Sequence, residues 1–323
     1  MRPGDDGNDV LQQRLISGNL IALAIIALMI ADAWLARFLP QDWKVSGFSV
    51  EYWALHGALC TALLVTLAAL LTRELLAMAR AHGFFPLRHA TFVFTIGLVV
   101  GPYVTYNLRE TARYYDESWS GFWLAIALGY AFWMQAVRRG TEQVLVNIAT
   151  TMFIVFYAGG LVGFMTKLRM EVGGPEGAVL LLFSVFIMKI TDVGAYFTGM
   201  LFGRTKLIPW LSPKKTWEGL FGGVVVAILA AFGVGKWLAQ SGLVAGHARV
   251  FESIWLLPLF AVMMALFSIA GDLAGSLLKR DARLKDSSHL IPGMGGVLDI
   301  LDSTLLGAPA AWFFWTRAAW LAD

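Results

Sequence analysis

IWLLPLFAVMMALFSIAG, residues 254–271, carries no charged side chain and leads directly into DLAGSLLKRDARLKDSSHLIPGMGGVLDILDS, residues 272–303. A helix that crosses a bilayer needs roughly 20 mainly apolar residues. The second stretch keeps a helical spacing of polar residues at first and then brings in proline and glycine. Together the two stretches predict a membrane-spanning helix that continues into a segment rich in charged and hydroxyl-bearing residues.

The rest of the chain has the composition of a membrane protein. Hydrophobic residues make up 58%, charged residues 15%, and the mean hydropathy is +0.67, whereas a soluble chain carries about a quarter charged residues. The long apolar runs exclude a β-barrel, whose strands would give short alternating runs. We expect an all-α, polytopic integral membrane bundle of about nine spanning helices. They lie near 15–38, 53–72, 90–108, 119–137, 144–165, 177–201, 219–239, 254–271 and 297–315.

We expect one membrane domain over residues 1–323, with amino-terminal helices of unclear role in 1–170 and a catalytic half in 177–315. The formal charge is +3, and the bases fall between apolar runs rather than on one stripe, which argues against nucleic-acid binding. If the amino terminus lies on the cytoplasmic side, the loops richest in lysine and arginine lie on that side too, as the positive-inside rule favours. These loops carry Arg73, Arg80 and Arg88; Arg138 and Arg139; Arg204, Lys206, Lys214 and Lys215; and Lys279, Arg280, Arg283 and Lys285.

Two ionisable residues lie inside the expected span 177–201. Lys189 and Asp192 are three residues apart and so share a helical face. Ionisable groups within a membrane are functional candidates, although a plain internal ion pair would also explain these two. Asp192 continues a stripe with Tyr196, Gly199 and Gly203. The glycines of that stripe are also explained by close helix packing alone.

The next loop, GRTKLIPWLSPKKTWEG at residues 203–219, combines four cations with a predicted turn at Ser212-Pro213 and with Thr216 and Glu218 at a helix entrance. Lysine and hydroxyl donors beside helix amino-terminal amides suit phosphate oxygens. A loop that only set the membrane topology would need neither the turn nor the Thr216-x-Glu218 pair.

The stretch 272–303 holds the densest set of polar residues. We expect Lys285-Asp286 to end its first helix and the glycine-rich segment 292–296 to form a turn before a new helix. A juxtamembrane charge cluster without a ligand is the alternative. The first helix carries Asp272, Ser276, Arg280 and Arg283 on one face, and the second carries Asp299 and Asp302 three residues apart.

This set of groups suits nucleotidyl transfer between two phosphate-bearing substrates. Mg²⁺ takes one or two carboxylates plus substrate phosphates, orients the reactants and neutralises charge on the leaving group. Lysine and arginine clamp phosphate oxygens, and glycines let backbone amides approach a nucleotide. Asp272 and Asp299, at the ends of two helices joined by the glycine turn, are candidates to converge on one ion.

The same residues resemble the signature of the phosphatidate cytidylyltransferase family. That pattern is S-x-x-K-R, four residues, K-D, a proline-or-glycine turn and H-G-G-x-x-D-R-x-D. TDVGAYFTGMLFGRTKL and SPKKTWEG, upstream, also look like a family motif block. The resemblance covers about the carboxyl-terminal 40% of the chain, whereas the amino-terminal helices match only in general character, as in Glu74 with its basic loop. The matching positions are Ser276, Lys279, Arg280, Lys285, Asp286, Gly295, Gly296, Asp299 and Asp302.

The resemblance implies an enzyme that joins CTP to phosphatidic acid in a cytosol-facing polar funnel, giving CDP-diacylglycerol and pyrophosphate. It assigns metal roles to Asp272 and Asp299, and we add Asp302 as a third candidate ligand for Mg²⁺; a monovalent cation stays open. We expect a catalytic set of Asp272, Asp299, Lys279, Arg280, Lys285 and Asp286, and substrate contacts from Ser212, Lys214, Lys215, Thr216, Glu218, Ser276, Gly295, Gly296, Asp192 and Tyr196.

Two positions depart from the signature. Met294 stands at its histidine and Ile300 at its arginine. The attacking lipid phosphate is already anionic, so a general base is not obligatory, and the departures bear on substrate contacts and specificity. His289 could partly substitute for the missing histidine.

Other functions stay open at this point. They are a CTP-dependent polyprenol kinase, a cytidylyltransferase for another lipid, and a transporter or silent membrane scaffold. Transporters usually show inverted repeats with interrupted helices in both halves of the chain, whereas the polar residues here lie mostly in one half. We expect a multi-pass protein of the inner (plasma) membrane with its active site towards the cytoplasm. The sequence does not determine the oligomeric state, and a homodimer stays open.

The topology prediction can be tested at Lys214. A cysteine placed there in a cysteine-free chain should react with an impermeant thiol reagent only from the cytoplasmic face, and less when CTP is present. The same substitution at Leu243, in an opposite loop, is the matched control and should react only from outside. Labelling of position 214 from outside would overturn the topology.

Overall fold

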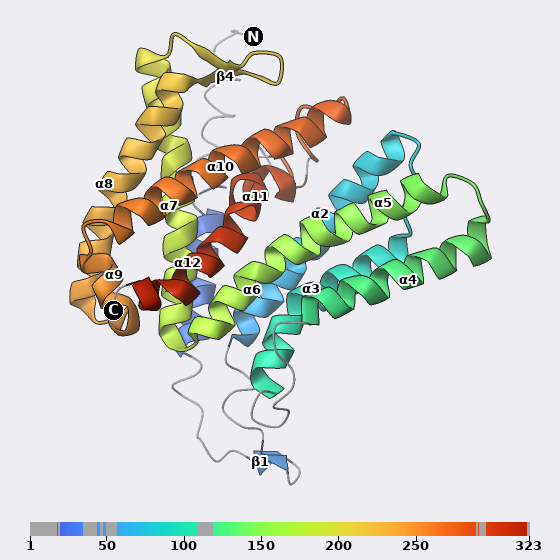
Figure 1. The fold of residues 1–323 in the computed structure, drawn as a ribbon, viewed down its shortest axis with the longest axis horizontal. Helices are drawn as coiled ribbons and strands as arrows, with labels where there is room; N and C mark the ends of the chain where they lie inside the picture. The colour runs from blue at the N-terminus through green and yellow to red at the C-terminus, as the bar shows by residue number, and fades with distance from the viewer. Residues whose placement is uncertain are drawn as a thin grey trace, which may run out of the picture. The chain divides into compact units, whose positions relative to one another are not determined.

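The structure is a computed structural model, and it describes residues 18, 20–34, 44–45, 48–49, 57–108, 119–288, 290 and 295–321. Helices dominate these residues (Figure 1). A helix at Leu20–Trp34 precedes β1 (Lys44–Val45), β2 (Phe48–Ser49), α2 (Ala58–Ala81), α3 (Arg88–Leu108), α4 (Trp119–Arg139), α5 (Val144–Ile154), a π-helical segment η2 (Val155–Gly160), α6 (Leu161–Val172), α7 (Gly174–Phe202), β3 (Lys206–Ile208), β4 (Ser212–Thr216), α8 (Trp217–Ser241), η3 (Ala245–His247), α9 (Ala248–Glu252), α10 (Leu256–Asp281), α11 (Val297–Leu305) and α12 (Gly307–Leu321).

Seven helices among the described residues are long and apolar enough to cross a membrane. They are α2, α3, α4, the continuous helix Val144–Val172, α7, α8 and α10. An eighth span results if α11 and α12, bent by 41°, are counted together. The shorter apolar helix Leu20–Trp34 lies in the first predicted segment. The prediction of an all-α, polytopic membrane bundle is confirmed.

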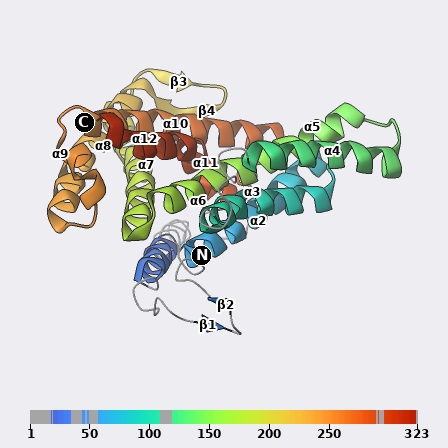
Figure 2. The same cartoon turned by 60° about the horizontal axis from the view of Figure 1, so that its bottom comes forward.

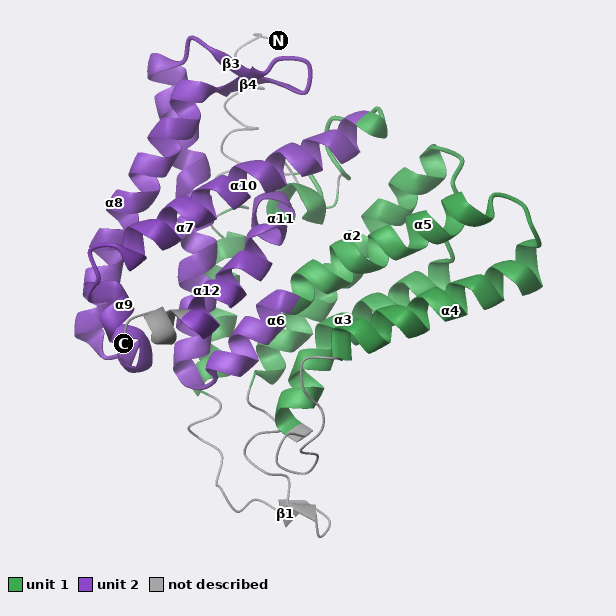
Figure 3. Cartoon of the chain, viewed as in Figure 1, with its two compact units in different colours: residues 1–163, 281–301 green, residues 164–280, 302–323 purple. Residues whose placement is uncertain are grey.

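The chain divides into two compact units (Figure 3). Unit 1 contains residues 1–163 and 281–301, and unit 2 contains residues 164–280 and 302–323. Residues 281–301, which the sequence analysis grouped with the catalytic half, therefore belong with the amino-terminal helices. His289, the Pro292-Gly293 part of the glycine turn and Met294 lie outside the described residues.

The core of unit 1 forms where α3 packs against its neighbours. Leu87 and one face of α3 contact residues of α4, α5 and η2. Glycines bring η2 and the start of α6 close to α3. A Cβ at Gly159 would lie 2.8 Å from the Thr95 Cα, and one at Gly163 would lie 2.7 Å from the Leu98 carbonyl oxygen. Small residues of this kind let membrane helices approach at backbone distance.

Unit 2 is built on a pair of neighbouring antiparallel helices, α7 and α8. A Cβ at Gly219 would lie 2.8 Å from the Ala195 carbonyl oxygen, and a Cβ at Gly223 would lie 2.9 Å from that of Thr191. On the α7 side, Gly199 and Gly203 face the Thr216 side chain. The packing explanation of the Gly199 and Gly203 stripe is therefore supported.

A β-hairpin joins the two helices, and Figures 1 and 2 both place it at the end of the α7–α8 pair. Strand β3 pairs with β4 in the antiparallel sense, with Lys206 opposite Thr216 and Ile208 opposite Ser212. The chain turns at residues 209–211, where the Leu211 amide donates to the Ile208 carbonyl at 3.2 Å. The predicted turn at Ser212-Pro213 is wrong, because those two residues begin β4.

Helix α10 extends beyond its apolar part, as predicted, but ends at Asp281. Arg283 has φ 55° and lies past the helix end, so its predicted place on the face of Asp272 and Arg280 is wrong. Lys285-Asp286 likewise follows the helix end rather than forming it. The predicted second helix is confirmed as α11, with Asp299 in its first turn.

The close packing of α7 and α8 predicts different effects at two glycines of α8. Gly223→Ala should lower the free energy of unfolding by about 1–3 kcal/mol, because the new methyl group meets the α7 backbone. Gly233→Ala is the matched control, since a Cβ there has nothing within 4 Å and alanine favours helix. Thermal unfolding in detergent should show a lower midpoint for the first variant only. Equal midpoints would contradict the packing.

Candidate functional site

In unit 2, helices α7 and α10 and the last four residues of α11 bring polar side chains together between apolar residues. Lys189 of α7 donates from Nζ to Ser303 Oγ of α11 at 2.7 Å. Asp192, one turn further along α7, accepts from Ser268 Oγ of α10 at 2.9 Å. Both residues of the predicted Lys189/Asp192 pair are therefore bonded to hydroxyls of other helices, which ties α7 to α10 and α11.

Asp272 of α10 forms an ion pair with the β-hairpin of unit 2. Its Oδ2 lies 2.5 Å from Lys215 Nζ on β4. A third of the Asp272 side chain and a quarter of the Lys215 side chain are exposed, so solutes can reach this pair. Two of the predicted site residues, more than fifty positions apart in sequence, are thus brought together.

A second and more deeply buried ion pair lies further along α10. Lys279 Nζ is 3.7 Å from Asp302 Oδ2, and both side chains are largely buried. Asp302 also accepts from the Ser303 amide at 2.7 Å. Two glycines of α10, Gly271 and Gly275, leave room for Asp302. A Cβ at Gly275 would lie 2.7 Å from the Asp302 Cβ. Gly271 and Gly275 are thus part of the construction of the site.

In unit 2, these contacts gather three carboxylates and three ammonium groups, which we call the unit 2 charge cluster. Its members are Asp192, Asp272, Asp302, Lys189, Lys215 and Lys279. A buried charge is costly unless an opposite charge or hydrogen bonds compensate it. Because Lys215 and Lys279 pair with carboxylates, the cluster can receive phosphate groups by exchanging one anionic partner of a lysine for another.

The donor set of this cluster fits Mg²⁺. No group of three or more His, Cys, Asp or Glu side chains that could hold a metal occurs among the described residues. Mg²⁺ seldom needs such a cage, because it is commonly held by one or two carboxylates with substrate phosphates and water. The accessible Asp272 and the neighbouring Asp302 supply carboxylate oxygens of that kind.

Unit 1 holds a separate carboxylate centre around Glu74 of α2. Glu74 is buried, and its two oxygens accept from four donors. The hydroxyls of Ser287 and Ser288 donate at 3.0 and 2.7 Å, and the amides of Val297 and Leu298 donate at 2.9 Å each. These amides open α11 and have no partner within the helix, so Glu74 caps α11 and holds the segment before it.

Asp299 holds the other side of the same segment. Its Oδ2 accepts from the Ser287 amide at 2.8 Å and from the Gly296 amide at 2.9 Å. Ser287 Oγ lies 2.7 Å from the same oxygen, so Asp299 and Glu74 share the single hydrogen of that hydroxyl. A Cβ at Gly296 would overlap the Ser287 and Glu74 side chains. Gly295 has φ 93°, a backbone conformation that glycine adopts without strain. Both glycines of the motif are thus required by the geometry around two carboxylates.

The remaining predicted residues take various positions. Thr216 accepts from the Gly219 amide at 3.1 Å and so caps α8, and Glu218 accepts from the amides of Arg204 and Thr205. Both residues fix the hairpin to α8. Lys214 and Tyr196 are exposed, Tyr196 against Phe197. Ser212 lies on β4, Ser276 and Arg280 lie on α10, Ile300 lies on α11, and Lys285 and Asp286 lie exposed between α10 and α11.

Asp272 lies in unit 2 and Asp299 in unit 1, so their convergence on one ion stays a prediction. No site role was predicted from the sequence for Glu74, Ser268, Ser287, Ser288 or Ser303. An acid inside an apolar helix is a functional candidate by the rule that singled out Asp192, and Glu74 fits it. The serines gave no comparable signal.

Comparison with known proteins adds a second line of evidence. The model of a family described as the cytidylyltransferase family matches residues 15–317. A phosphatidate cytidylyltransferase of Haemophilus influenzae is 37% identical over 205 residues, which cover 61% of this chain and 66% of that protein. Those of Staphylococcus epidermidis and a Synechocystis species are 35% and 29% identical, over 57% and 75% of this chain and 65% and 83% of the relative. The first two alignments span just under two thirds of the relatives' own length.

The Glu74 centre makes a structural prediction. Glu74→Gln replaces one acceptor oxygen with a donor and leaves one of the two α11 amides, Val297 or Leu298, unpaired, at a cost of about 1–3 kcal/mol. Hydrogen–deuterium exchange should become faster in peptides that cover residues 287–298. Glu142→Gln, at an exposed residue of unit 1, is the control and should leave exchange there unchanged. Unchanged protection in Glu74→Gln would remove Glu74 from this role.

Proposed function

The chain belongs to the cytidylyltransferase family, and we propose that it is a phosphatidate cytidylyltransferase, converting CTP and phosphatidic acid into CDP-diacylglycerol and pyrophosphate. The observation that carries the proposal is the unit 2 charge cluster, with the Lys215–Asp272 and Lys279–Asp302 ion pairs on membrane helices and their hairpin. The names of the relatives support the same activity.

The cluster suits substrates that come from two phases. Asp272 and Lys215 are partly exposed, so a water-soluble triphosphate can reach them. Asp302, Lys279 and Lys189 lie deeper between apolar helices, where a lipid phosphate can enter from the bilayer. We propose that the base-rich end of the bundle, including the hairpin, faces the cytoplasm at the inner membrane, because Lys and Arg favour that side.

In the proposed reaction, an oxygen of the lipid phosphate attacks the α-phosphorus of CTP in line. A new P–O–P bond forms, and the bond between the α-phosphorus and the bridging oxygen breaks, so that pyrophosphate leaves. Mg²⁺, held by Asp272 and Asp302, would neutralise charge on the phosphates. Lys215 exchanges Asp272 for a phosphate oxygen of the nucleotide, and Lys279 likewise exchanges Asp302 for a phosphate oxygen. The attacking oxygen is already anionic, so no side chain has to remove a proton.

Carboxylates of unit 1 contribute by positioning. Glu74 and Asp299 fix the segment that carries Ser287, Ser288 and the two glycines. Fixed amides and exposed bases on such a segment, including Lys285, suit a nucleotide. A metal role for Asp299, which the family resemblance implies, is part of the proposal.

The proposal is tested with purified protein in mixed micelles containing CTP, phosphatidic acid and Mg²⁺, with and without K⁺. Asp272→Asn should lower kcat on the order of a hundredfold or more, because a group that stabilises the transition state is lost. Asp281→Asn is the matched control on the same helix, since Asp281 is largely exposed and pairs with His82. That variant should keep wild-type turnover.

The products separate the competing functions. Pyrophosphate and CDP-diacylglycerol in equal amounts are expected, whereas a CTP-dependent lipid kinase would release CDP. Near-normal turnover of Asp272→Asn at saturating Mg²⁺ would remove Asp272 from the site. A wild type that forms no CDP-lipid from any lipid phosphate offered would overturn the proposed activity.

A further inference from the structure

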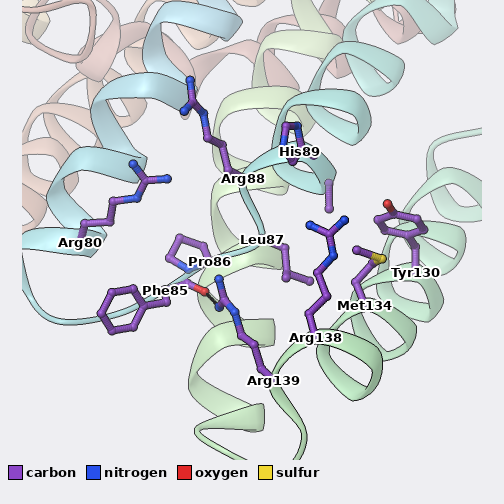
Figure 4. Close-up of a pocket in the computed structure, with 11 residues that line it drawn as sticks. Arg80, Phe85, Pro86, Leu87, Arg88, His89, Tyr130, Met134, Arg138 and Arg139 are labelled. Atoms are coloured by element: carbon purple, nitrogen blue, oxygen red, sulfur yellow. Dashed lines mark hydrogen bonds between the residues drawn. The ribbon is translucent and has the colours of Figure 1, made fainter.

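A pocket of about 520 Å³ lies in unit 1, at the ends of three helices. Arg80 comes from the last turn of α2, Arg88 and His89 from the first turn of α3, and Arg138 and Arg139 from the last turn of α4. Figure 4 shows these side chains around the segment Phe85–Leu87. No residue of the unit 2 charge cluster, and neither Glu74 nor Asp299, lines this pocket.

The charge of the pocket is one-sided. Four arginines and a histidine line it, and no carboxylate does. Within the described part of the chain, no carboxylate pairs with Arg80, Arg88 or Arg138. Guanidinium groups that line one pocket repel one another, and an anion with several oxygens relieves that repulsion while accepting charge-assisted hydrogen bonds.

The wall of the pocket is held in place by hydrogen bonds. The Phe85 amide donates to Asn147 Oδ1 at 3.1 Å, and the Leu87 amide donates to Thr151 Oγ1 at 3.0 Å. Arg139 donates to the Phe85 carbonyl oxygen, as the dashed line in Figure 4 marks. The loop between α2 and α3 is thus hydrogen-bonded to both α4 and α5. These bonds hold the wall of the pocket in one position.

The first turn of α3 adds to the positive potential. The helix begins at Arg88, and Leu87 before it offers no side-chain oxygen to cap the first amides. Helix amino termini carry partial positive charge and unpaired N–H groups, which favour bound anions. Together with the guanidinium groups, this makes the pocket suitable for phosphate.

The opposite wall is apolar and belongs to a lipid-facing helix. Tyr130 and Met134 of α4 line the pocket. Only 17% of the α4 span is buried, the smallest share among the candidate spans, and Trp133 and Val137 near its end are exposed. A soluble anion needs no apolar wall, whereas a phospholipid can place its headgroup among the arginines and its acyl chains along α4.

We propose that this pocket binds a phosphate-bearing anion and that the phosphate is the headgroup of an anionic membrane phospholipid. The arginines also fit the bias of basic residues towards the cytoplasmic side. That bias requires charges in the loops, but it requires neither a fixed wall nor the convergence of three helix ends. The proposal goes beyond the proposed reaction, because binding here needs no CTP and no turnover.

Native mass spectrometry of the detergent-purified full chain tests the proposal. The lipid probes are dioleoyl phosphatidylglycerol and dioleoyl phosphatidylcholine, and glycerol 3-phosphate is the soluble probe. Wild type should retain phosphatidylglycerol in preference to phosphatidylcholine. Arg88→Gln with Arg138→Gln should weaken that retention on the order of tenfold or more, since two charge-assisted bonds are lost. The corresponding Arg→Lys pair should lose less.

Lys236→Gln is the control, because it removes one exposed charge of α8 that lies outside the pocket. Thermal unfolding and single Arg80→Gln and Arg88→Gln variants guard against misfolding of the double variant. Equal retention by wild type and the double variant, or equal retention of both lipids by wild type, would overturn the proposal. Glycerol 3-phosphate binding as tightly as the lipid would support the anion site but identify a soluble phosphate as its ligand.

Discussion

A charged group between apolar helices is stable only when an opposite charge or several hydrogen-bond donors surround it. The polar architecture of this protein follows from that constraint. In unit 2, Asp272 and Asp302 pair with Lys215 and Lys279, and Asp192 is held by Ser268. Each of these three contacts joins residues of two different helices, or of a helix and a strand. The requirement to compensate charge therefore also determines how α7, α10, α11 and the β-hairpin pack.

The carboxylates of unit 1 obey the same constraint with neutral donors. Glu74 lies on α2 and accepts from the Leu298 amide, 224 positions away in sequence. Asp299 collects one hydroxyl and two amides on a single oxygen. Because these donors come from one short segment, satisfying the two acids also orders that segment. Order of this kind suits a segment whose glycines and bases are proposed to contact a nucleotide.

Glycines set how closely the polar groups can approach. Asp302 sits against α10 only because Gly271 and Gly275 carry no side chain, and Gly296 leaves room for Glu74 and Ser287. The same device brings α7 and α8 together at Gly219 and Gly223. Packing and chemistry are thus not alternative explanations for these glycines. Close approach is the condition under which a lysine and a carboxylate from different elements meet inside apolar surroundings.

The sequence by itself determined the class of fold and the identity of most candidate residues. Long apolar runs leave few options in a bilayer, since only helices satisfy their own backbone hydrogen bonds over such a length. Charged residues within or directly next to those runs were the candidates Asp192, Asp272, Asp299 and Asp302. Only the tertiary structure decided the partners: Lys215 for Asp272, Lys279 for Asp302, and a helix cap for Glu74. Which residues pair depends on contacts between positions far apart in sequence, and the spacing of neighbouring residues does not predict such contacts. The hairpin turn at 209–211 was missed for the same reason, because pairing of β3 with β4 overrides local preference. The end of α10 at Asp281 was missed as well.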